Sequence, residues 1–285
     1  MDQLTRDGTE LEHFWGLPGP AGGWSQVLLI VPSAGGAAMC YLSPATGEGP
    51  ASDGDPSARA GLIRAAIADF RARVPAGRVA QALFEPAALD VEAAYAGAGF
   101  TRLAELAYMK RELPKRRGAQ ADTPAWPEGV RVEPLSEMPA AQGRRLLLAA
   151  LQRSYTDTLD CPALCAMRSP EEALASHTAV GQHDPSLWHL VSLHSEPEGC
   201  LLLSSIPQHR TMELVYLGLS PALRGRGLGR ALVWMALTLL GGRPERTIAC
   251  AVDTSNTPAM RLYRGAGFYE FASRTAMVLP LRGGH

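Results

Sequence analysis

Hydrophobic positions along the chain repeat either about every second residue, as in a strand, or about every 3.6 residues, as in a helix. These patterns predict strands that alternate with helices. The clearest stretch lies in the second half. Residues 211–219 are rich in β-branched and aromatic side chains, and Pro221 ends this predicted strand because proline cannot donate a hydrogen bond to a sheet. Residues 230–240 then combine strong helix formers with no internal breaker, until Gly241 stops the predicted helix. A turn rich in glycine and arginine, residues 224–229, joins the two.

The same two periods predict the other elements of the chain. Further strands are predicted at 26–31, 37–42, 79–84, 105–113, 130–132, 187–194, 200–206, 247–252 and 273–281. Further helices are predicted at 59–73, 87–96, 138–155 and 171–180, the last with Ser169 and Glu172 as a capping box.

The glycine-rich turn has the features of a phosphate-binding loop. Gly225, Gly227 and Gly229 leave backbone N–H groups uncovered where a helix begins, and unpaired donors at the positive end of a helix dipole attract phosphate. Arg224 and Arg226 add positive charge beside them. A P-loop would end in Gly-Lys-Ser/Thr, and a dinucleotide-binding fold would space its glycines as Gly-x-Gly-x-x-Gly. The Gly-Lys-Ser/Thr end of a P-loop is absent here. A dinucleotide-binding loop is an alternative, although its glycine spacing matches this turn less well.

This turn resembles the pyrophosphate loop of the GNAT N-acetyltransferase superfamily, Arg/Gln-x-x-Gly-x-Gly/Ala, which Arg224, Gly227 and Gly229 match. A second block supports the resemblance, because Asn256 and residues 259–268 are similar to the family's Asn-x-x-Ala-x-x-Leu-Tyr-x-x-x-Gly-Phe. The resemblance covers nearly all of 130–285. It implies an α/β fold in which a twisted mixed sheet is flanked by helices.

Part of the second block also occurs in the first half of the chain. Residues 95–100, Tyr-Ala-Gly-Ala-Gly-Phe, match residues 263–268, Tyr-Arg-Gly-Ala-Gly-Phe, at an offset of 168 (263 minus 95). The predicted strands before and after the motif fit as well, and internal repeats indicate repeated architecture. We therefore expect two tandem GNAT-like units. The expected division is a degenerate domain over 1–113, a linker over 114–129 and a catalytic domain over 130–285.

The first unit lacks the phosphate loop. Alignment of the two helix starts pairs Ala58, Gly61 and Ile63 with Arg224, Gly227 and Gly229. A branched isoleucine side chain would crowd the place where phosphate meets the backbone. We expect the first unit to keep the fold without cofactor binding, so that one chain binds one acyl-CoA.

The resemblance implies acetyl-CoA as co-substrate and no metal. The residues implied in binding it are Leu217, Gly218, Leu219, Arg224, Gly225, Arg226, Gly227, Leu228, Gly229, Arg230 and Asn256. Asn256 is alternatively a helix cap. The backbone of 217–219 would hold the pantetheine arm as an added strand.

Two residues are candidates for proton transfer. Tyr263 is the proton donor that the resemblance implies, although a merely packed tyrosine is the alternative, since Tyr95 occupies the same place in the degenerate unit. Glu213 is the best-placed base, because a carboxylate within a strand is costly unless it is solvated or paired, and some family members carry a glutamate there. The alternative for Glu213 is a residue at the rim of the cleft.

The segment between the first two helices of the second unit resembles the border of the acceptor cleft. Its candidate substrate-binding residues are Tyr155, Asp157 and Asp160, and the two aspartates alternatively cap a turn. Cys161 and Cys165 lie close by with two histidines, but their spacing is not that of a zinc knuckle, so no metal is expected.

Composition narrows the class further. A formal net charge of −1 gives no bulk attraction to nucleic acid or anionic membranes. The longest apolar runs fall short of the roughly 18 residues that span a bilayer, and the N-terminus lacks the pattern of a signal peptide. We expect a cytoplasmic protein without a nucleic-acid or membrane partner, either monomer or homodimer.

The function that these residues predict is transfer of an acyl group, acetyl above all, from coenzyme A directly to a primary amine of a small molecule or peptide. The alternative is a non-catalytic module that binds acyl-CoA or another protein. The loops that shape the acceptor pocket are not fixed by one sequence, so the acceptor is left open.

Overall fold

The structure is a computed structural model that describes residues 13–19, 23–44, 56–115 and 126–282. Contacts divide the chain into two compact units, unit 1 with residues 1–105 and 274–285 and unit 2 with residues 106–273. This division differs from the expected one because two strands cross from one unit to the other. Strand β5 (Thr101–Glu112) enters unit 2, and strand β11 (Tyr269–Pro280) returns to unit 1. The middle of the expected linker, 116–125, lies outside the described residues.

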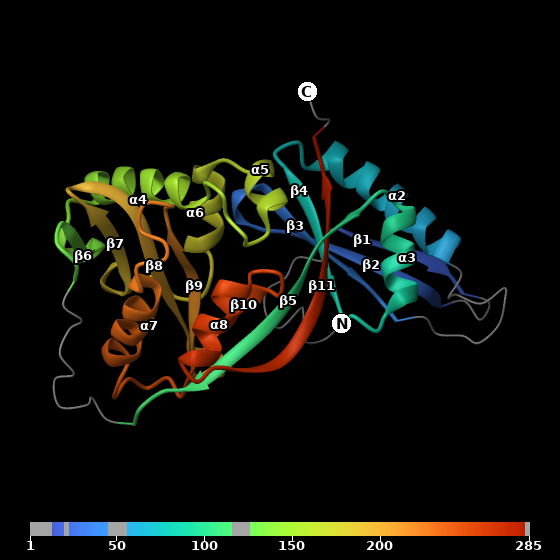
Figure 1. Cartoon of the computed structure of the whole chain (residues 1–285). Coiled ribbons are helices and arrows are strands. Elements are labelled where there is room, and N and C mark those ends of the chain that lie inside the picture. Colours follow the sequence, from blue (N-terminus) through green and yellow to red (C-terminus); the bar gives the residue numbers. More distant parts are fainter. Residues whose placement is uncertain (1–12, 20–22, 45–55, 116–125, 283–285) are drawn as a thin grey trace. The chain divides into compact units, whose positions relative to one another are not determined.

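Unit 1 is a mixed sheet with two helices on one face (Figure 1). Its own strands are β1 (Phe14–Pro18), β2 (Trp24–Pro32), β3 (Ala37–Leu42) and β4 (Val79–Phe84). They pair in chain order, antiparallel except for β3 with β4, and the end of β11 pairs antiparallel with the free side of β4. Helices α2 (Pro56–Arg73) and α3 (Leu89–Gly97) bury a core that includes Ile30, Phe70 and Tyr95.

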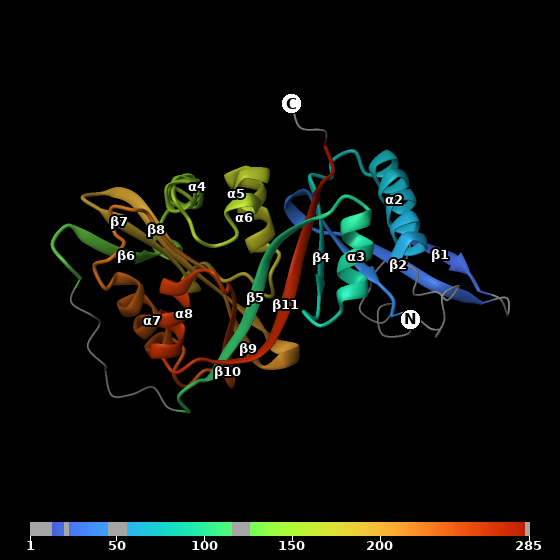
Figure 2. The same cartoon turned by 45° about the vertical axis from the view of Figure 1, so that its right-hand side comes forward.

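Unit 2 is a larger mixed sheet with helices on both faces (Figure 2). Its strand order is β5-β10-β9-β8-β7-β6, in which only the β9–β10 pair is parallel. The strands not yet given are β6 (Val130–Pro134), β7 (Trp188–Leu193), β8 (Glu196–Ile206), β9 (Thr211–Leu219) and β10 (Thr247–Asp253). The helices are α4 (Ala140–Ser154), α5 (Pro162–Met167), α6 (Pro170–Thr178), α7 (Leu228–Leu239) and α8 (Thr257–Gly265).

Helices α4 and α6 cover one face of the unit 2 sheet, and α7 and α8 cover the other (Figures 1 and 2). The predicted capping box of α6 is confirmed, because the Ser169 hydroxyl accepts from the Glu172 N–H and the Glu172 carboxylate accepts from the Ser169 N–H. The core side chains of this unit include Leu151, Leu202, Met212 and Val233, all fully buried. In the described part of the chain, no helix is both long and apolar enough to cross a bilayer.

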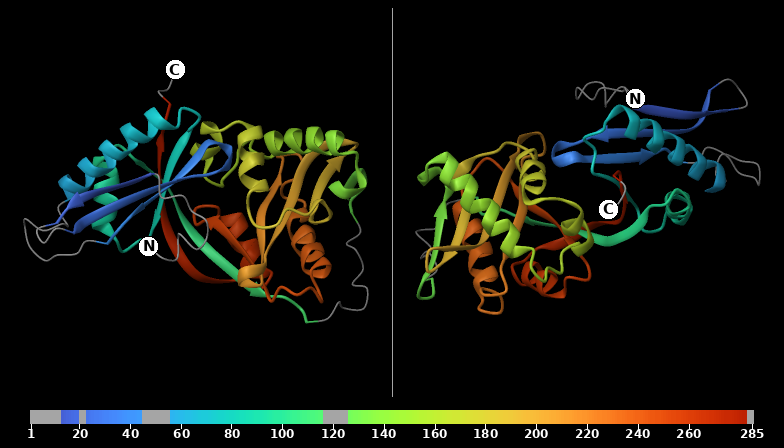
Figure 3. Two further views of the ribbon diagram at one scale, coloured as in Figure 1. Left: turned by 180° about the vertical axis from the view of Figure 1, so that it is seen from behind. Right: turned by 90° about the horizontal axis from the view of Figure 1, so that it is seen from above.

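The predicted fold class is confirmed, since each unit is a mixed sheet flanked by helices. The predicted strands and helices are present with shifted ends. Three elements are not among the predicted ones, which are β1, the short helix α5 and helix α8. Figure 3 shows both units from behind and from above.

The reason given above for the loss of the phosphate loop in unit 1 was wrong. Helices α2 and α7 end at equivalent places, Arg73 and Leu239, at the same offset of 166 (239 minus 73) that the alignment of helix starts used. However, α2 begins at Pro56, so residues 58–63 are already helical where unit 2 has its turn. Ile63 points into the core and is fully buried, so it does not crowd a loop. The N–H groups in its place are used within a helix.

A buried arginine ties this part of unit 1 together. Arg59, which the same offset pairs with Gly225, has no exposed surface, and it donates to the Asp90 carboxylate and, at 3.2 Å, to the Ser43 carbonyl. The Tyr95 hydroxyl donates to the Cys40 carbonyl at 3.1 Å. The end of β3 and the starts of α2 and α3 are therefore joined by hydrogen bonds.

The Arg59–Asp90 pair gives a stability prediction for unit 1. Replacement of Asp90 by Ala leaves a guanidinium buried without its counter-ion, which should lower the free energy of unfolding by about 1–3 kcal/mol in urea denaturation. The matched control is Glu105→Gln, which removes an exposed partner of Arg102 and should change stability by less than about 0.5 kcal/mol. Equal effects of the two variants would contradict the prediction.

Candidate functional site

Strands β9 and β10 separate after three residue pairs, and this separation opens the candidate site. Their parallel pairing ends at Glu213 and Ala249. Beyond that point β9 stays paired with β8 as far as Leu219, and β10 stays paired with β5 as far as Asp253. Beyond Glu213 and Ala249, the edges of β9 and β10 that face each other are therefore not paired with each other.

A bulge in β9 accompanies the separation. Tyr216 lies opposite Leu202 of β8, and Leu214 lies opposite the next residue, Leu203, so Val215 is an extra residue without a partner. A bulge re-aims the side chains that follow it. It places Tyr216 on the same face as Glu213, the face covered by α4 and α6, where its ring contacts His177.

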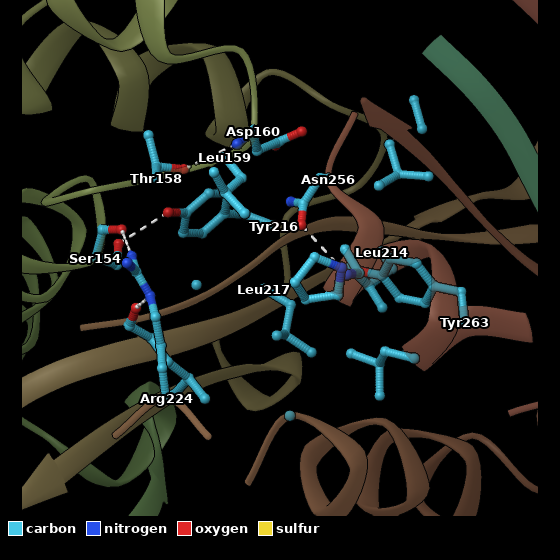
Figure 4. Close-up of a pocket in the computed structure, with 18 of the residues that line it drawn as sticks. Ser154, Thr158, Leu159, Asp160, Leu214, Tyr216, Leu217, Arg224, Asn256 and Tyr263 are labelled. Atoms are coloured by element: carbon cyan, nitrogen blue, oxygen red, sulfur yellow. Dashed lines mark hydrogen bonds between the residues drawn. The ribbon is translucent and has the colours of Figure 1, made fainter. Parts of the chain in front are cut away.

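A cavity of about 440 Å³ lies where the strands part (Figure 4). Five segments of unit 2 line it, which are the end of β9, the end of β10, the glycine-rich turn, the start of α8 and the loop after α4. The lining residues are Ser154, Asp157, Thr158, Leu159, Asp160, Leu214, Val215, Tyr216, Leu217, Gly218, Leu219, Arg224, Gly225, Gly229, Ala251, Val252, Asn256, Pro258, Ala259, Leu262 and Tyr263. Most predicted site residues are brought together here.

The glycine-rich turn presents uncovered backbone N–H groups. Gly225 and Gly227 have φ angles of 72° and 77°, a conformation that side chains disfavour, and a Cβ at either place would meet nothing within 4 Å. Gly227 is the N-cap of α7 and offers no side chain to the first helical N–H groups. Leu228 turns into the core, whereas Arg226 and Arg230 are exposed. The backbone here fits an anionic phosphate group.

Arg224 was expected to add positive charge to the phosphate-binding turn, but its side chain binds carbonyl groups of the protein instead. Its guanidinium donates to three backbone carbonyls, those of Leu219 at 2.9 Å, Asp157 at 2.9 Å and Ser154 at 2.8 Å (Figure 4). The side chain therefore fastens the loop after α4 to the end of β9. It borders the cavity, but its donors are occupied by the protein.

The backbone of Leu217, Gly218 and Leu219 forms a free strand edge along the cavity. On one side these residues pair with 199–201 of β8, and on the other side β10 has moved away. Backbone N–H and C=O groups along such an edge can pair with an extended ligand. The geometry fits the expected pantetheine arm.

Asn256 is the N-cap of α8, and Tyr263 lies in the last turn of the same helix. The Asn256 side chain accepts from the Ala259 N–H at 3.2 Å, so it caps the helix while it lines the cavity. The Tyr263 hydroxyl has no hydrogen-bond partner among the described residues, in contrast to Tyr95 of unit 1 (Figure 4). Burial, with smaller effects of Cys250 and Asp160, raises the pKa of the Tyr263 phenol.

Glu213 lies at the point where β9 and β10 part, between Ser204 of β8 and Ala249 of β10. Its side chain is half-buried, and burial raises the pKa of its carboxyl from 4.5 to about 7. It does not itself line the cavity. The Ser204 hydroxyl opposite is fully buried, and no partner for it is found in the described part of the chain.

The three predicted acceptor-side residues are placed differently. Asp157 and Asp160 line the cavity, whereas Tyr155 lies behind it and packs on Tyr216 with 5.8 Å between ring centroids. Asp160 accepts from the Asp253 N–H at 3.4 Å. Burial raises the pKa of the Asp160 carboxyl by more than the hydrogen bond from the Asp253 N–H lowers it, and the charge of Asp253 adds a smaller increase.

Sequence analysis missed a polar and aromatic cluster beside the cavity. The Tyr216 hydroxyl is 2.8 Å from the Ser154 hydroxyl, and His177 stacks on the Tyr216 ring at 5.2 Å. Burial, followed by the charge of Arg168, lowers the pKa of His177 to about 4. Tyr155, His177 and Tyr216 lie far apart in the sequence, so no local pattern links them, and only the bulge in β9 turns Tyr216 toward the other two.

The cysteines of the acceptor-side loop do not form a metal site with the nearby histidines. Among the described residues, no group of three or more histidine, cysteine or acidic side chains could hold a metal ion. His177 stacks on Tyr216, and His183 packs against Trp188. Cys161 and Cys165 carry free thiols.

Comparisons with known proteins agree with the fold and the motifs. Residues 147–268 match the model of the acetyltransferase (GNAT) family. A mycothiol acetyltransferase of Beutenbergia cavernae is 38% identical over 100 residues, which cover 34% of this chain and 33% of the relative. One of Streptomyces bingchenggensis is 28% identical over 170 residues, 60% of this chain and 53% of the relative. The matched segments thus span about a third to a half of these relatives.

Solved structures share the fold over the whole chain. A GCN5-related N-acetyltransferase from Sphaerobacter thermophilus has a TM-score of 0.65 at 18% identity, covering 100% of this chain and 86% of that one. A tandem GNAT protein from the clavulanic acid biosynthesis pathway has a TM-score of 0.50 at 15% identity, covering 100% and 88%. The chain has the tandem GNAT fold, and residues 147–268 of its second unit match the acetyltransferase (GNAT) family.

The arrangement of Arg224 gives a prediction about the cavity wall. Arg224→Met removes three charge-assisted hydrogen bonds to carbonyls, so the loop at 154–160 should open more often. Hydrogen–deuterium exchange of peptides from this loop should rise by about tenfold. Arg261→Met, which removes an exposed arginine from α8, serves as the control. Unchanged exchange in Arg224→Met would mean that its contacts do not hold the loop.

Proposed function

We propose that the protein is an acetyl-CoA-dependent N-acetyltransferase that acts on a primary amine. One observation carries the proposal, which is that the free edge of β9 leads through the glycine-rich turn to the uncapped start of α7, and that Tyr263, whose hydroxyl has no hydrogen-bond partner among the described residues, lines the same cavity. When bound, acetyl-CoA supplies an acetyl thioester, whose carbon–sulfur bond breaks as the amine nitrogen forms a bond to the carbonyl carbon. Residues of the chain would bind this thioester, take a proton from the amine and return a proton to the leaving thiolate.

The glycine-rich turn would bind the pyrophosphate. The N–H groups of 228–230 have no partners within the helix, and Gly225 and Gly227 allow a phosphate oxygen to approach the backbone. The backbone groups of 217–219 that face away from β8 would pair with the pantetheine arm, and an N–H among them would stabilise negative charge that develops on the carbonyl oxygen. Exposed Arg226 and Arg230 add positive charge near the turn.

Glu213 would take the proton from the acceptor. An ammonium group cannot attack a carbonyl, so a base must first remove a proton. A carboxyl with a pKa of about 7 suits this step near neutral pH. Because Glu213 is set back from the cavity lining, the proton would pass through water.

Tyr263 would return a proton to the leaving thiolate. Its hydroxyl lies in the cavity wall with no protein acceptor among the described residues, so it is available as a donor. The raised pKa keeps the phenol protonated before transfer. The acceptor proposed is a small molecule, which the names of the mycothiol acetyltransferase relatives support.

Substitution of Glu213 tests the base. Glu213→Gln should lower kcat/KM by about 100-fold or more while CoA affinity is retained. The wild-type rate should rise with pH through about 7, because only the deprotonated carboxylate accepts a proton, and the variant should lose this rise. Stability provides a control for misfolding. The folded-state pKa lies above the unfolded value, so Glu213 destabilises the fold as pH rises from 4.5 to 7, and Glu213→Gln should be no less stable at pH 8.

Tyr263→Phe should likewise reduce turnover and leave CoA affinity and the rise at pH 7 intact. If the wild-type protein binds CoA but leaves acetyl-CoA unchanged with a broad panel of amines, the non-catalytic module is the better account. Mass spectrometry of acetylated products from a metabolite extract would then decide between the two.

Calorimetric titration tests the division of labour between the units. One chain should bind one CoA, because residues 58–63 of unit 1 are helical and Arg59 is buried there. Gly227→Ile with Gly229→Ile should abolish binding, since loss of two or three charge-assisted bonds at about 1.5–3 kcal/mol each weakens affinity by several orders of magnitude. Gly61→Ala, inside α2 with nothing within 4 Å, should leave binding unchanged. A stoichiometry of two would show a working site in unit 1.

A further inference from the structure

A row of side chains crosses three strands of unit 2 beside the cavity. Glu213 of β9 pairs with Ala249 of β10, and Ala249 pairs with Lys110 of β5. Directly opposite residues of paired strands present their side chains on the same face of a sheet. Glu213, Ala249 and Lys110 therefore share one face. In the next row Ala251 lies opposite Tyr108 on that face.

This face is open at β10. Ala249 is half-exposed and Ala251 is exposed, whereas Ile248 and Cys250 on the opposite face are buried in the core. Ala251 also lines the cavity, so the open face leads into it. The small side chains of Ala249 and Ala251 leave a shallow surface on β10, called the floor below, between β9 with Glu213 and β5 with Lys110. The backbones of β9 and β5 are roughly 10 Å apart, which is two strand spacings.

The Lys110 ammonium is held at the far side of this floor without a counter-ion. Its Nζ lies 4.6 Å from the ring centroid of Phe271 and 5.7 Å from that of Tyr269, and both rings are about half-exposed. Aromatic faces attract an ammonium group without neutralising it. Among the described residues, no carboxylate lies within ion-pairing distance of Lys110.

Lysine is rare in this chain, which contains Lys110 and Lys115 among 27 cationic residues. The neighbouring Arg111 serves the structure, because it donates to the Ala266 carbonyl and lies 5.5 Å from the Trp234 ring. A single lysine presents one mobile point charge, which matches one carboxylate better than a doubly charged phosphate. Among the described residues, Glu213 forms no ion pair with Lys110 either.

We propose that the acceptor is a small amine that also carries a carboxylate, bound across this face with its amino group toward Glu213 and its carboxylate on Lys110. The proposal rests on the proposed acetyl transfer. Opposite charges at the two ends of the floor orient such a molecule, and the exposed Ala251 leaves room for the amine to enter the cavity. Lys110 lies in the part of β5 that belongs to unit 2, so the proposed acceptor site is contained in that unit.

Matched acceptors test this inference. Each of a series of short peptides and amino acids is compared with its carboxamide, so that both members keep the amine and only one keeps the carboxylate. The wild-type enzyme should prefer the carboxylates in kcat/KM. In Lys110→Met, which keeps the apolar stem, KM for the carboxylates should rise by roughly fivefold or more. KM for the carboxamides and for acetyl-CoA should stay the same.

Lys115→Met is the control, because it removes the chain's second lysine, which is exposed. It should leave the preference for carboxylates intact. Acetyl transfer that shows the same preference in wild type and Lys110→Met would overturn the acceptor proposal and leave the proposed function standing. If no member of either series is acetylated although other amines are, the acceptor proposal fails alone. If CoA binds in calorimetry but no amine of a broad panel is acetylated, the proposed function fails and the acceptor proposal falls with it.

Discussion

The pairing of β9 with β10 ends after three residue pairs, and the rest of the site depends on this interruption. A strand edge with unpaired N–H and C=O groups needs another partner. In unit 2 the bulge at Val215 and the uncapped start of α7 leave that need to a ligand. In unit 1 the corresponding place is closed by hydrogen bonds from Arg59 to the Ser43 carbonyl and from Tyr95 to the Cys40 carbonyl. The same fold therefore leaves this strand edge open in unit 2 and closed in unit 1, and local hydrogen bonds determine which of the two occurs.

Tyrosine in the repeated motif shows how far a motif determines a role. Tyr95 and Tyr263 occupy the same position before Gly-Ala-Gly-Phe, and both are buried. The Tyr95 hydroxyl bonds to a backbone carbonyl, whereas the Tyr263 hydroxyl borders a cavity and finds no partner in the described part of the chain. The motif fixes the helix and the packing of its ring. The use of the hydroxyl is fixed by the strand opposite, which the motif does not contain.

Local patterns in the sequence predicted the fold class, most strands and helices, the repeat and the glycine-rich turn. These features depend on residues close together in the chain, as the capping box at Ser169 illustrates. The exchange of β5 and β11, the bulge at Val215 and the three carbonyl contacts of Arg224 were not predictable in this way. Each joins segments far apart in sequence, and strand register or side-chain direction becomes definite only when the sheet is assembled. The roles of Glu213 and Tyr263 stay predictions.

The path of β11 has a consequence for synthesis of the chain. Strand β4 ends at Phe84, but its antiparallel partner begins only in the last part of the sequence, near Thr275. A ribosome adds about 5–20 residues per second, so β4 waits on the order of 10–40 seconds for the residues that cover its edge. Throughout that time one edge of β4, the edge opposite β3, is open to pairing with other chains. In the nascent chain the edge of β4 is therefore a place where aggregation competes with folding until β11 has been synthesised.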